Sequence, residues 1–485
     1  MGQTAGWLVL GAWGIALGCV GPDVNDTRGS RDSGDPATTP SNPPTTRGTW
    51  PVDQVRMEPT FHLFREIGAS VMWGAVPLDR DRYPQEGREI TWRVEDPGVA
   101  TVAADGRVWA GGAGETEVVA EIEGVEARAG VRVDLWDDTG VGRHRMCGLK
   151  TGGRAYCRSR TGRVLRVPHD QPVEKISVAG GHACLLDAMG DAWCWGEGSL
   201  GQLGHGGTDD VEDPVRVAGG HAFIGIAASS GGVGTFAHTC GLTVGGEVWC
   251  WGHGGGGQLG VDEADLPTCD HGGEDRPCSP EPVRVQVPTD ATGGATDAIV
   301  VAIDARAGVT VALTDDGLAH EWGASGVTSS PVRPVEGVSA LITITRGERF
   351  TCGTDALGEA TCWGATAGSR LGRGEDPSPA PGAVLGGHVF AQVDAGRAHA
   401  CGITEEGEAL CWGENAQGEL GLGTFGDPEP APGATVTELR FARIVAGDGA
   451  TCAVTRDGRL FCWGAFNSGA SSWFATPTRV PDPPV

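Results

Sequence analysis

The residues of this chain best suited to covalent chemistry are cysteines that recur in pairs ten residues apart. A three-residue hairpin loop needs a glycine-favouring, left-handed residue at its last position, and it sets the flanking cysteines opposite each other on antiparallel strands. Each pair has a glycine at that position, as in Gly190 and Gly246. Opposed residues lie within the reach of a disulfide. The spacing predicts six disulfide-closed hairpins: Cys147/Cys157, Cys184/Cys194, Cys240/Cys250, Cys352/Cys362, Cys401/Cys411 and Cys452/Cys462.

A seventh copy of the hairpin supports the pairing. It keeps Gly317 at the turn but has Val311 and Glu321 at the two cysteine positions. A disulfide needs both of its cysteines, so a copy without the disulfide is expected to lack both. Independent metal ligands or buried reduced thiols, the alternatives, have no reason to disappear together. Cys269 and Cys278 form a further candidate pair within one long loop, which leaves one of the 15 cysteines over.

Three histidines occupy equivalent places, each two residues before a cysteine: His182, His238 and His399. They could converge on a central channel and hold a metal ion. The other copies carry Arg145, Val309, Phe350 and Ala450 at this place, so we expect a structural hydrogen-bonding role and no metal. The chain also lacks a His-Glu-x-x-His motif, a phosphate-binding loop ending in Gly-Lys-Ser/Thr and a Gly-x-Ser-x-Gly motif. We therefore expect no enzyme, no catalytic residue and no cofactor.

The segment 261–279 concentrates acidic side chains around Cys269 and Cys278. These are Asp262, Glu263, Asp265, Asp270, Glu274 and Asp275. Calcium prefers such oxygen ligands, but the alternation of a known calcium loop is missing. We expect a solvated loop closed by its own disulfide, and it is the best candidate recognition element because it differs most between the repeats.

The elements that must position these residues form a repeat. Cys-Trp-Gly occurs at 194–196, 250–252, 362–364, 411–413 and 462–464, Gly-x-Leu-Gly follows in several copies, and a Pro-x-Arg-Val strand comes next. This set closely resembles the repeats of the regulator of chromosome condensation (RCC1) family, whose fold is a seven-bladed β-propeller. The copies recur about every 51 residues, the size of a four-stranded blade. The resemblance implies an all-β, RCC1-like propeller over residues 137–485.

Two details of this propeller can be predicted. The tryptophan of each Cys-Trp-Gly is expected in the core between blades, although an aromatic stripe could also bind carbohydrate or a cofactor. The first copy departs from the pattern, with Arg158 in place of tryptophan and no Gly-x-Leu-Gly turn. Because the chain ends on the strand-like segment 476–480, we expect that segment to complete the first blade.

The N-terminal part divides into three segments. Residues 51–136 contain alternating runs such as 90–94, 99–102, 107–109, 117–120 and 131–133. The order Trp92, Gly106, Val108, Gly114 and Val119 resembles the group 2 bacterial Ig-like domain, a small β-sandwich that serves as a spacer or adhesive module. Residues 20–50 are polar and rich in proline and glycine, which predicts a disordered linker.

Residues 1–19 contain a short apolar run, 7–18, that is suited to an export signal. Ala16-Leu17-Gly18-Cys19 resembles the cleavage box of a bacterial lipoprotein, which implies lipidation of Cys19. The leucine lies one place later than usual, and no Lys or Arg precedes the apolar run. We expect an exported lipoprotein on the periplasmic or extracellular side of the membrane, with plain secretion as the alternative.

Charge narrows the possible partners. A formal net charge of −27 repels a phosphate backbone, so we expect no nucleic acid. We expect membrane contact through the lipid anchor only, and a monomer. The favoured function is an exported, non-enzymatic scaffold that binds a protein partner through loops at the propeller rim. The family resemblance keeps open an extracellular enzyme inhibitor of the β-lactamase-inhibitor type and a guanine-nucleotide exchange factor, and an enzyme with an unrecognised site is a further alternative.

Overall fold

The computed structural model describes residues 51–142, 145–158, 163–229, 236–288, 298–324, 330–365, 367–465 and 473–483. Residues 1–50 form a separate unit that lies outside the described residues, and with it lie the predictions on the signal sequence, Cys19 and the linker. No helix in the described part of the chain is long and apolar enough to span a bilayer.

Residues 54–133 fold into three sheets. One pairs β1 (Gln54–Glu58) with β4 (Gly74–Leu78), the second has the order β2 (Phe61–Phe64), β9 (Val125–Val133), β8 (Gly114–Ile122) and β5 (Thr91–Val94), and the third has the order β3 (Ser70–Met72), β7 (Arg107–Ala110) and β6 (Ala100–Val102). The sheets share one core that includes Trp73, Val108, Val118 and Val131. The alternating runs found in the sequence lie largely in β5 to β9.

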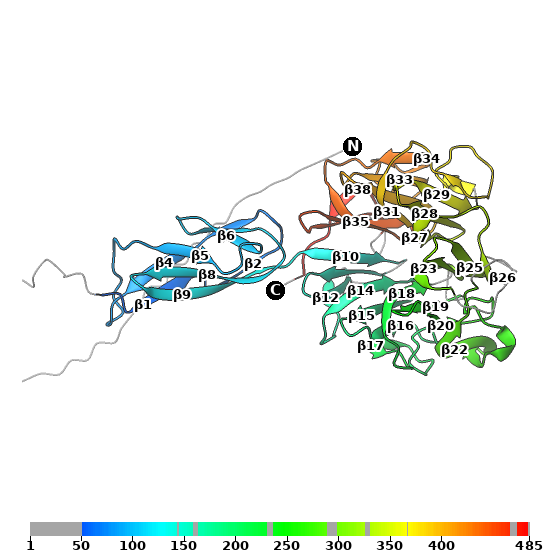
Figure 1. Cartoon of the computed structure of the whole chain (residues 1–485), viewed down its shortest axis with the longest axis horizontal. Coiled ribbons are helices and arrows are strands. Elements are labelled where there is room, and N and C mark those ends of the chain that lie inside the picture. Colours follow the sequence, from blue (N-terminus) through cyan, green and yellow to red (C-terminus); the bar gives the residue numbers. More distant parts are fainter. Residues whose placement is uncertain are drawn as a thin grey trace, which may run out of the picture. The chain divides into compact units, whose positions relative to one another are not determined.

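The rest of the described chain is a β-propeller with seven sheets, one per predicted repeat (Figure 1). Blade 1 comprises β10 (Trp136–Val141), β11 (Met146–Lys150), β12 (Arg154–Arg158) and β13 (Val164–Arg166), and blade 2 comprises β14 (Val173–Val178), β15 (His182–Asp187), β16 (Ala192–Gly196) and β17 (Val211–Arg216). Blade 3 comprises β18 (Phe223–Ser229), β19 (His238–Thr243), β20 (Val248–His253) and β22 (Glu274–Val285), to which β21 (Thr268–His271) adds a fifth strand. Blade 4 comprises β23 (Val300–Arg306), β24 (Val309–Thr314), β25 (Ala319–Gly323) and β26 (Ser330–Pro334).

The last three blades repeat the order. Blade 5 comprises β27 (Leu341–Arg346), β28 (Phe350–Asp355), β29 (Ala360–Gly364) and β30 (Gly382–Ala383), and blade 6 comprises β31 (Phe390–Ala395), β32 (His399–Thr404), β33 (Ala409–Asn415) and β34 (Gly426–Ala434). Blade 7 comprises β35 (Phe441–Ala446), β36 (Ala450–Thr455), β37 (Leu460–Gly464) and β38 (Phe474–Arg479). Two 3-10 turns, η1 (Glu263–Asp265) and η2 (Ala367–Ser369), lie in the connections of blades 3 and 5.

The predicted completion of the first blade by the C-terminal strand is wrong. β38 pairs with β37 of its own blade, and β10 supplies the inner strand of blade 1. The Pro-x-Arg-Val segment is the outer strand of the blade that precedes it, as Val215 opposite Cys194 shows. The ring therefore closes by packing β10 against β35 and β36. β35 lies beside β10 in Figure 1.

The hairpins form as the glycine positions predict. Gly190 and Gly246 have φ angles of 79° and 78°, in the region that disfavours a Cβ. All six cysteine pairs face each other in register, and all are disulfides: Cys147–Cys157, Cys184–Cys194, Cys240–Cys250, Cys352–Cys362, Cys401–Cys411 and Cys452–Cys462. Val311 faces Glu321 in the same register of blade 4. Cys269 and Cys278 form the seventh disulfide.

Side chains on the inner strands link neighbouring blades to one another. Ser177, Asp304, Thr345 and Asp394 each stand opposite the first cysteine position of their own blade, which is Val311 in blade 4. Each accepts a hydrogen bond from a backbone N–H of the next blade: Ala228 N to Ser177 Oγ (2.9 Å), Arg346 N to Asp304 Oδ2 (2.7 Å), Ala395 N to Thr345 Oγ1 (3.0 Å) and Ala446 N to Asp394 Oδ2 (2.6 Å). Gly140 and Val445 hold this position in blades 1 and 7 and cannot form the bond.

Candidate functional site

In four blades the tryptophan after the second cysteine position, which is Trp251, Trp322, Trp412 or Trp463, packs against a turn of the preceding blade. The turn is Gly-x-Leu-Gly at 201–204, 257–260 and 418–421 and Ser-Arg-Leu-Gly at 369–372. The last glycine of the turn makes this contact possible, because a Cβ on Gly204 would lie 2.6 Å from Trp251 Nε1. In three of these contacts the indole N–H also donates to a backbone carbonyl of the same turn, whereas Trp463 Nε1 has no partner among the described residues. The three bonds are Trp251 Nε1 to Gln202 O (3.0 Å), Trp322 Nε1 to Gln258 O (3.0 Å) and Trp412 Nε1 to Arg370 O (3.1 Å). These tryptophans are fully buried, which confirms the predicted core between blades.

Blades 1 and 4 have no such turn sequence between their third and fourth strands. Trp363, which follows blade 4, is 5 % exposed, and its Nε1 has no partner among the described residues. Five residues, 159–163, separate β12 from β13, whereas fourteen, 197–210, separate β16 from β17. The short connection has no Gly-x-Leu-Gly sequence. Trp195 of blade 2 thus has no Gly-x-Leu-Gly sequence in the preceding blade to pack on, and its indole N–H is bonded to none of the described residues, whereas Trp251 Nε1 donates to Gln202 O. Trp195 is 5 % exposed, against 0 % for Trp251.

A cleft of about 800 Å³ lies where the missing turn would be. Its walls combine Trp195, Gly196 and Gly181 of blade 2 with the apolar side chains Leu165 and Val167 of blade 1. Charged residues line it too, with Arg145, Arg158 and Arg166 from blade 1 and Glu197, Asp210, Glu212 and Asp213 from blade 2. The cleft can therefore accommodate an apolar group beside polar and charged ones.

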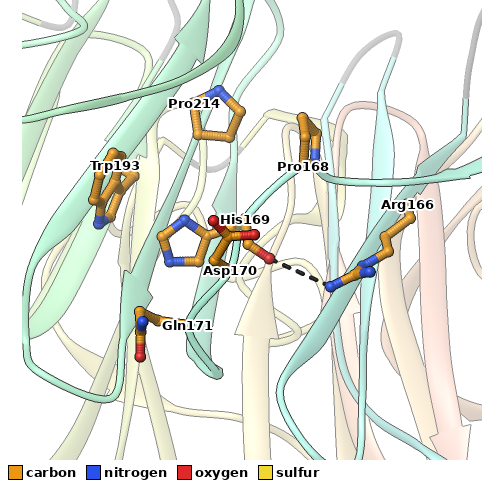
Figure 2. Close-up of a pocket in the computed structure, with 7 residues that line it drawn as sticks. All are labelled: Arg166, Pro168, His169, Asp170, Gln171, Trp193 and Pro214. Atoms are coloured by element: carbon orange, nitrogen blue, oxygen red, sulfur yellow. Dashed lines mark hydrogen bonds between the residues drawn. The ribbon is translucent and has the colours of Figure 1, made fainter.

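The outer end of the cleft continues into a second hollow of about 710 Å³, shown in Figure 2. His169 lies edge-on to Trp193, with ring centroids 4.9 Å apart. Both rings reach the buried Asp187, whose Oδ2 accepts from Trp193 Nε1 at 3.0 Å and lies 3.6 Å from His169 Nε2. Arg166 donates to the His169 carbonyl at 3.4 Å, as the dashed line in Figure 2 marks. These contacts fix the outer wall of the cleft.

The acidic segment predicted to be a recognition element forms the β21–β22 hairpin together with η1. The Cys269–Cys278 disulfide, a bond from Cys278 N to Pro267 O (2.9 Å) and another from Gly254 N to Pro277 O (2.8 Å) tie it to blade 3. Five of the six predicted acidic side chains are exposed: Asp262, Asp265, Asp270, Glu274 and Asp275. Glu263 is partly buried.

Three of these carboxylates make local contacts. Asp262 caps η1 by accepting from Ala264 N at 3.0 Å, and Asp270 accepts from Gly273 N at 2.8 Å. Glu274 pairs with Arg276 at 2.7 Å. In the described part of the chain no three His, Cys, Asp or Glu side chains are grouped so that they could hold a metal ion. The hairpin is a fixed, acidic projection.

The three equivalent histidines do not converge on a common point. Each is fully buried and shares a hydrogen bond with a threonine of the next blade: His182 Nε2 with Thr239 Oγ1 (2.8 Å), His238 Nε2 with Thr310 Oγ1 (2.8 Å) and His399 Nε2 with Thr451 Oγ1 (2.9 Å). Burial lowers the pKa of His182 and His399 to about 3 and that of His238 to about 4. They therefore bind the blades to one another as neutral groups, which is the structural role predicted for them.

The blade 1–blade 2 cleft was missed by reasoning from the sequence. Its signals were present, since Arg158 and the absent Gly-x-Leu-Gly turn both mark the first copy as different. Their meaning depends on a contact between residues about fifty positions apart, such as Gln202 and Trp251. Nothing in the local pattern indicates that a turn in one blade covers the tryptophan of the next.

Comparison with known proteins identifies the repeats. Models described as "Regulator of chromosome condensation (RCC1) repeat" match residues 189–235, 390–419, 406–454 and 441–470. The human E3 ubiquitin-protein ligase HERC2 is 28% identical over 310 residues, which cover 56% of this chain and 6% of that protein. The mitochondrial RCC1 domain-containing protein RUG3 of Arabidopsis thaliana is 28% identical over 217 residues, which cover 42% of this chain and 44% of that protein. The chain thus spans less than half the length of these curated relatives.

Solved structures share the fold. Human WBSCR16 matches with a TM-score of 0.55 at 18% identity, covering 69% of this chain and 90% of that one. Yeast RCC1 (Prp20), crystallised with Kap60, matches with a TM-score of 0.53 at 19% identity, covering 66% of this chain and 78% of that one. At these identities the likeness is one of fold alone.

Proposed function

The chain is a protein of the RCC1 repeat family, and from this premise we propose that it is an exported, non-enzymatic scaffold that binds a protein partner. The observation that carries the proposal is the acidic β21–β22 hairpin, which adds a strand to one blade and is closed by its own disulfide. A rigid projection that differs from the other blades can confer specificity, whereas the shared hairpin frame cannot. Its exposed carboxylates suit a partner with a basic surface.

Rigidity supports a recognition role. A pre-ordered loop loses little conformational entropy on binding, so more of the contact energy remains as affinity. The hairpin has its disulfide and two backbone bonds to the blade. Yeast RCC1, which shares the fold, was crystallised bound to another protein, Kap60.

The disulfides support the proposed compartment. Seven disulfides in the described residues are typical of an oxidising environment, because the cytosol keeps thiols reduced. Export to the periplasmic or extracellular side, with attachment through a lipidated Cys19, is part of the proposal. It is tested by incorporation of labelled fatty acid and by membrane fractionation, both of which Cys19→Ser should abolish while wild type retains them.

The decisive experiment compares two proteins as bait. Wild type is matched with a variant in which Asp265, Asp270 and Asp275 are each replaced by asparagine, because asparagine keeps the shape of the side chain and the bond from Gly273 N. Envelope and secreted proteins of the source cell are captured on both baits. A partner should be retained by wild type and bind the variant at least tenfold more weakly, about 1.4 kcal/mol. Its association rate should fall steeply with salt for wild type only.

Two results contradict the proposal. A partner that binds the triple variant as tightly as wild type would remove the hairpin from the interface. A captured small molecule that the protein converts to product would identify an enzyme. The disulfide content of both baits, measured by mass after alkylation, checks that they are equally folded.

A further inference from the structure

The turns at 201–204, 369–372 and 418–421, of which the second reads Ser-Arg-Leu-Gly and the others Gly-x-Leu-Gly, show how such a turn is held between two blades. The N–H of a glycine that follows each turn donates to the outer strand of the next blade, and at the first two turns the indole bond described above adds to it. These bonds are Gly206 N to Pro280 O (2.9 Å), Gly374 N to Pro430 O (2.8 Å) and Gly423 N to Ala475 O (2.8 Å). The leucine of the turn lies in the core of its own blade, where Leu203 shares a cluster with Cys194, Val215 and Val217.

The groups that hold such a turn are all present in the cleft between blades 1 and 2. Trp195 takes the place of Trp251 and is 5 % exposed, and its indole N–H, unlike that of Trp251, is bonded to none of the described residues. Gly196 faces Val211 as Gly252 faces Ser279, so the carbonyl of Glu212 takes the place of Pro280 O.

The leucine position is also present, and it is open. Leu165 faces Cys157 as Val215 faces Cys194, and Val167 N bonds to Ala155 O as Val217 N bonds to Ala192 O. Leu165 is 48% exposed. Cys157 is partly buried, whereas Cys194 is 0% exposed. The three residues that would surround a leucine side chain, Cys157, Leu165 and Val167, all line the cleft.

We propose that the cleft between blades 1 and 2 is a docking site for a Gly-x-Leu-Gly-like turn supplied by a partner protein. The proposal rests on the proposed function as a protein-binding scaffold and names a second contact of that partner. The partner's carbonyl accepts from Trp195 Nε1, its leucine packs on Leu165 and Val167, and a following N–H donates to Glu212 O. A glycine must lie over the indole, because a Cβ there would meet the ring as it would at Gly204.

The same geometry sets the chemistry of the occupant. The cleft offers the indole N–H and flat ring of Trp195, the carbonyl of Glu212 and the apolar surface of Leu165 and Val167. Together these features match a compact polypeptide turn. Arg166 and Asp170 at the outer hollow (Figure 2) and Glu212 and Asp213 at the cleft add charges of both signs around it. A partner turn flanked by one acidic and one basic residue would satisfy both signs.

The test uses the whole protein and a cyclised peptide with the sequence of residues 197–210, which contains Gly201-Gln202-Leu203-Gly204. We expect the peptide to shift the Trp195 indole ¹H–¹⁵N resonance, assigned by its loss in Trp195→Phe, and not that of Trp251. A peptide with aspartate at the position of Leu203 should cause no shift. No saturable shift of the Trp195 resonance up to millimolar peptide would overturn the proposal.

Two variants separate binding from folding. Leu165→Glu places a charge at the leucine position, and because Leu165 is exposed the protein should fold normally; calorimetry should find at least tenfold weaker peptide binding. Ile224→Glu is the matched control, since Ile224 is 47% exposed, close to the 48% of Leu165, and lies outside the cleft. Trp195→Phe keeps an aromatic ring but removes the N–H together with the five-membered ring, and we expect about a fivefold loss of affinity. Equal losses in Leu165→Glu and Ile224→Glu would refute the assignment.

The outcome is distinguishable from failure of the proposed function. A captured partner that depends on the acidic hairpin but binds Leu165→Glu like wild type would overturn the docking site and leave the scaffold function standing. A dimer of this chain that Leu165→Glu dissociates, measured by sedimentation, would replace the partner protein with a second copy. Tenfold weaker binding of the captured partner to Leu165→Glu, with the control unchanged, supports the proposal.

Discussion

Replacing Asp394 by asparagine should change how the stability of the propeller depends on pH. Asp394 lies on the inner strand of blade 6 and accepts from Ala446 N at 2.6 Å and from Thr345 Oγ1 at 2.9 Å. Burial raises its pKa to about 6, and the nearby Asp304 carboxylate adds to the rise, while Arg306 and the two hydrogen bonds oppose it. The unfolded chain has the ordinary value of 3.8.

The sign and size of this pH effect follow from the linkage between proton binding and unfolding. A carboxyl that holds its proton more tightly in the folded state makes its full contribution to the stability of that state below about pH 4. This contribution is lost as the pH rises through about 6. A rise of about two pKa units corresponds to at most about 3 kcal/mol, of which about 2 kcal/mol falls between pH 4.5 and 7.5. The buried histidines change stability in the opposite direction over this range, so only the difference between wild type and variant isolates Asp394.

The assay is urea unfolding followed by tryptophan fluorescence at pH 4.5 and 7.5, with the disulfides intact. Asparagine can accept from Ala446 N and donate to Thr345 Oγ1, so the fold should be kept. The free energy of unfolding of wild type should fall by about 2 kcal/mol more than that of Asp394→Asn over this interval. Asp427→Asn, at an exposed site on β34, is the control and should follow wild type. Parallel pH profiles for wild type and Asp394→Asn would refute the reasoning.

Three further predictions address the other contacts. In urea titrations, Gly204→Ala should lower the free energy of unfolding by about 2 kcal/mol more than Gly220→Ala. Both glycines have a positive φ, but only a Cβ on Gly204 would meet Trp251. Equal losses of stability would contradict the packing. Val311→Cys with Glu321→Cys should form a disulfide, seen as the absence of alkylation, and stabilise by up to about 3 kcal/mol; free thiols would show that the register is wrong. Between pH 7 and 5 the free energy of unfolding should fall by about 2 kcal/mol less for His238→Gln than for wild type. In wild type the buried His238 has a pKa of about 4 and stays neutral, whereas in the unfolded chain its pKa is 6.5 and it takes up a proton. Urea titrations at both pH values measure this difference, and equal falls would contradict the burial.

Local spacing was enough to predict the blades. The ten-residue separation and the turn glycine fix a hairpin without reference to the rest of the chain, so the six disulfides and the seventh pair at Cys269 and Cys278 could be predicted and are present. The order of strands in a blade could not be derived in the same way. A strand that lies between two hairpins can join either one, and the sequence of residues 214–217 does not distinguish them.

The two candidate sites differ in the same respect. The acidic hairpin could be predicted because its charges and cysteines are contiguous in the sequence. The cleft could not, because it arises from what one blade fails to supply to its neighbour. Trp195 has the same sequence context as Trp251, Cys-Trp-Gly, and only the missing turn of blade 1 distinguishes their surroundings.

The placement of the disulfides has a mechanical consequence. Every disulfide lies within one blade, so the junction between blades 7 and 1 depends on packing such as that of Val141 with Ala450. Tension between the two ends of the propeller would therefore act on a non-covalent joint, and blades would separate while their hairpins stayed closed. Each disulfide prevents the ten-residue segment that it closes from extending, which removes about 30 Å of contour length. The end-to-end length of the stretched propeller would therefore be shorter than that of a fully extended chain with the same number of residues.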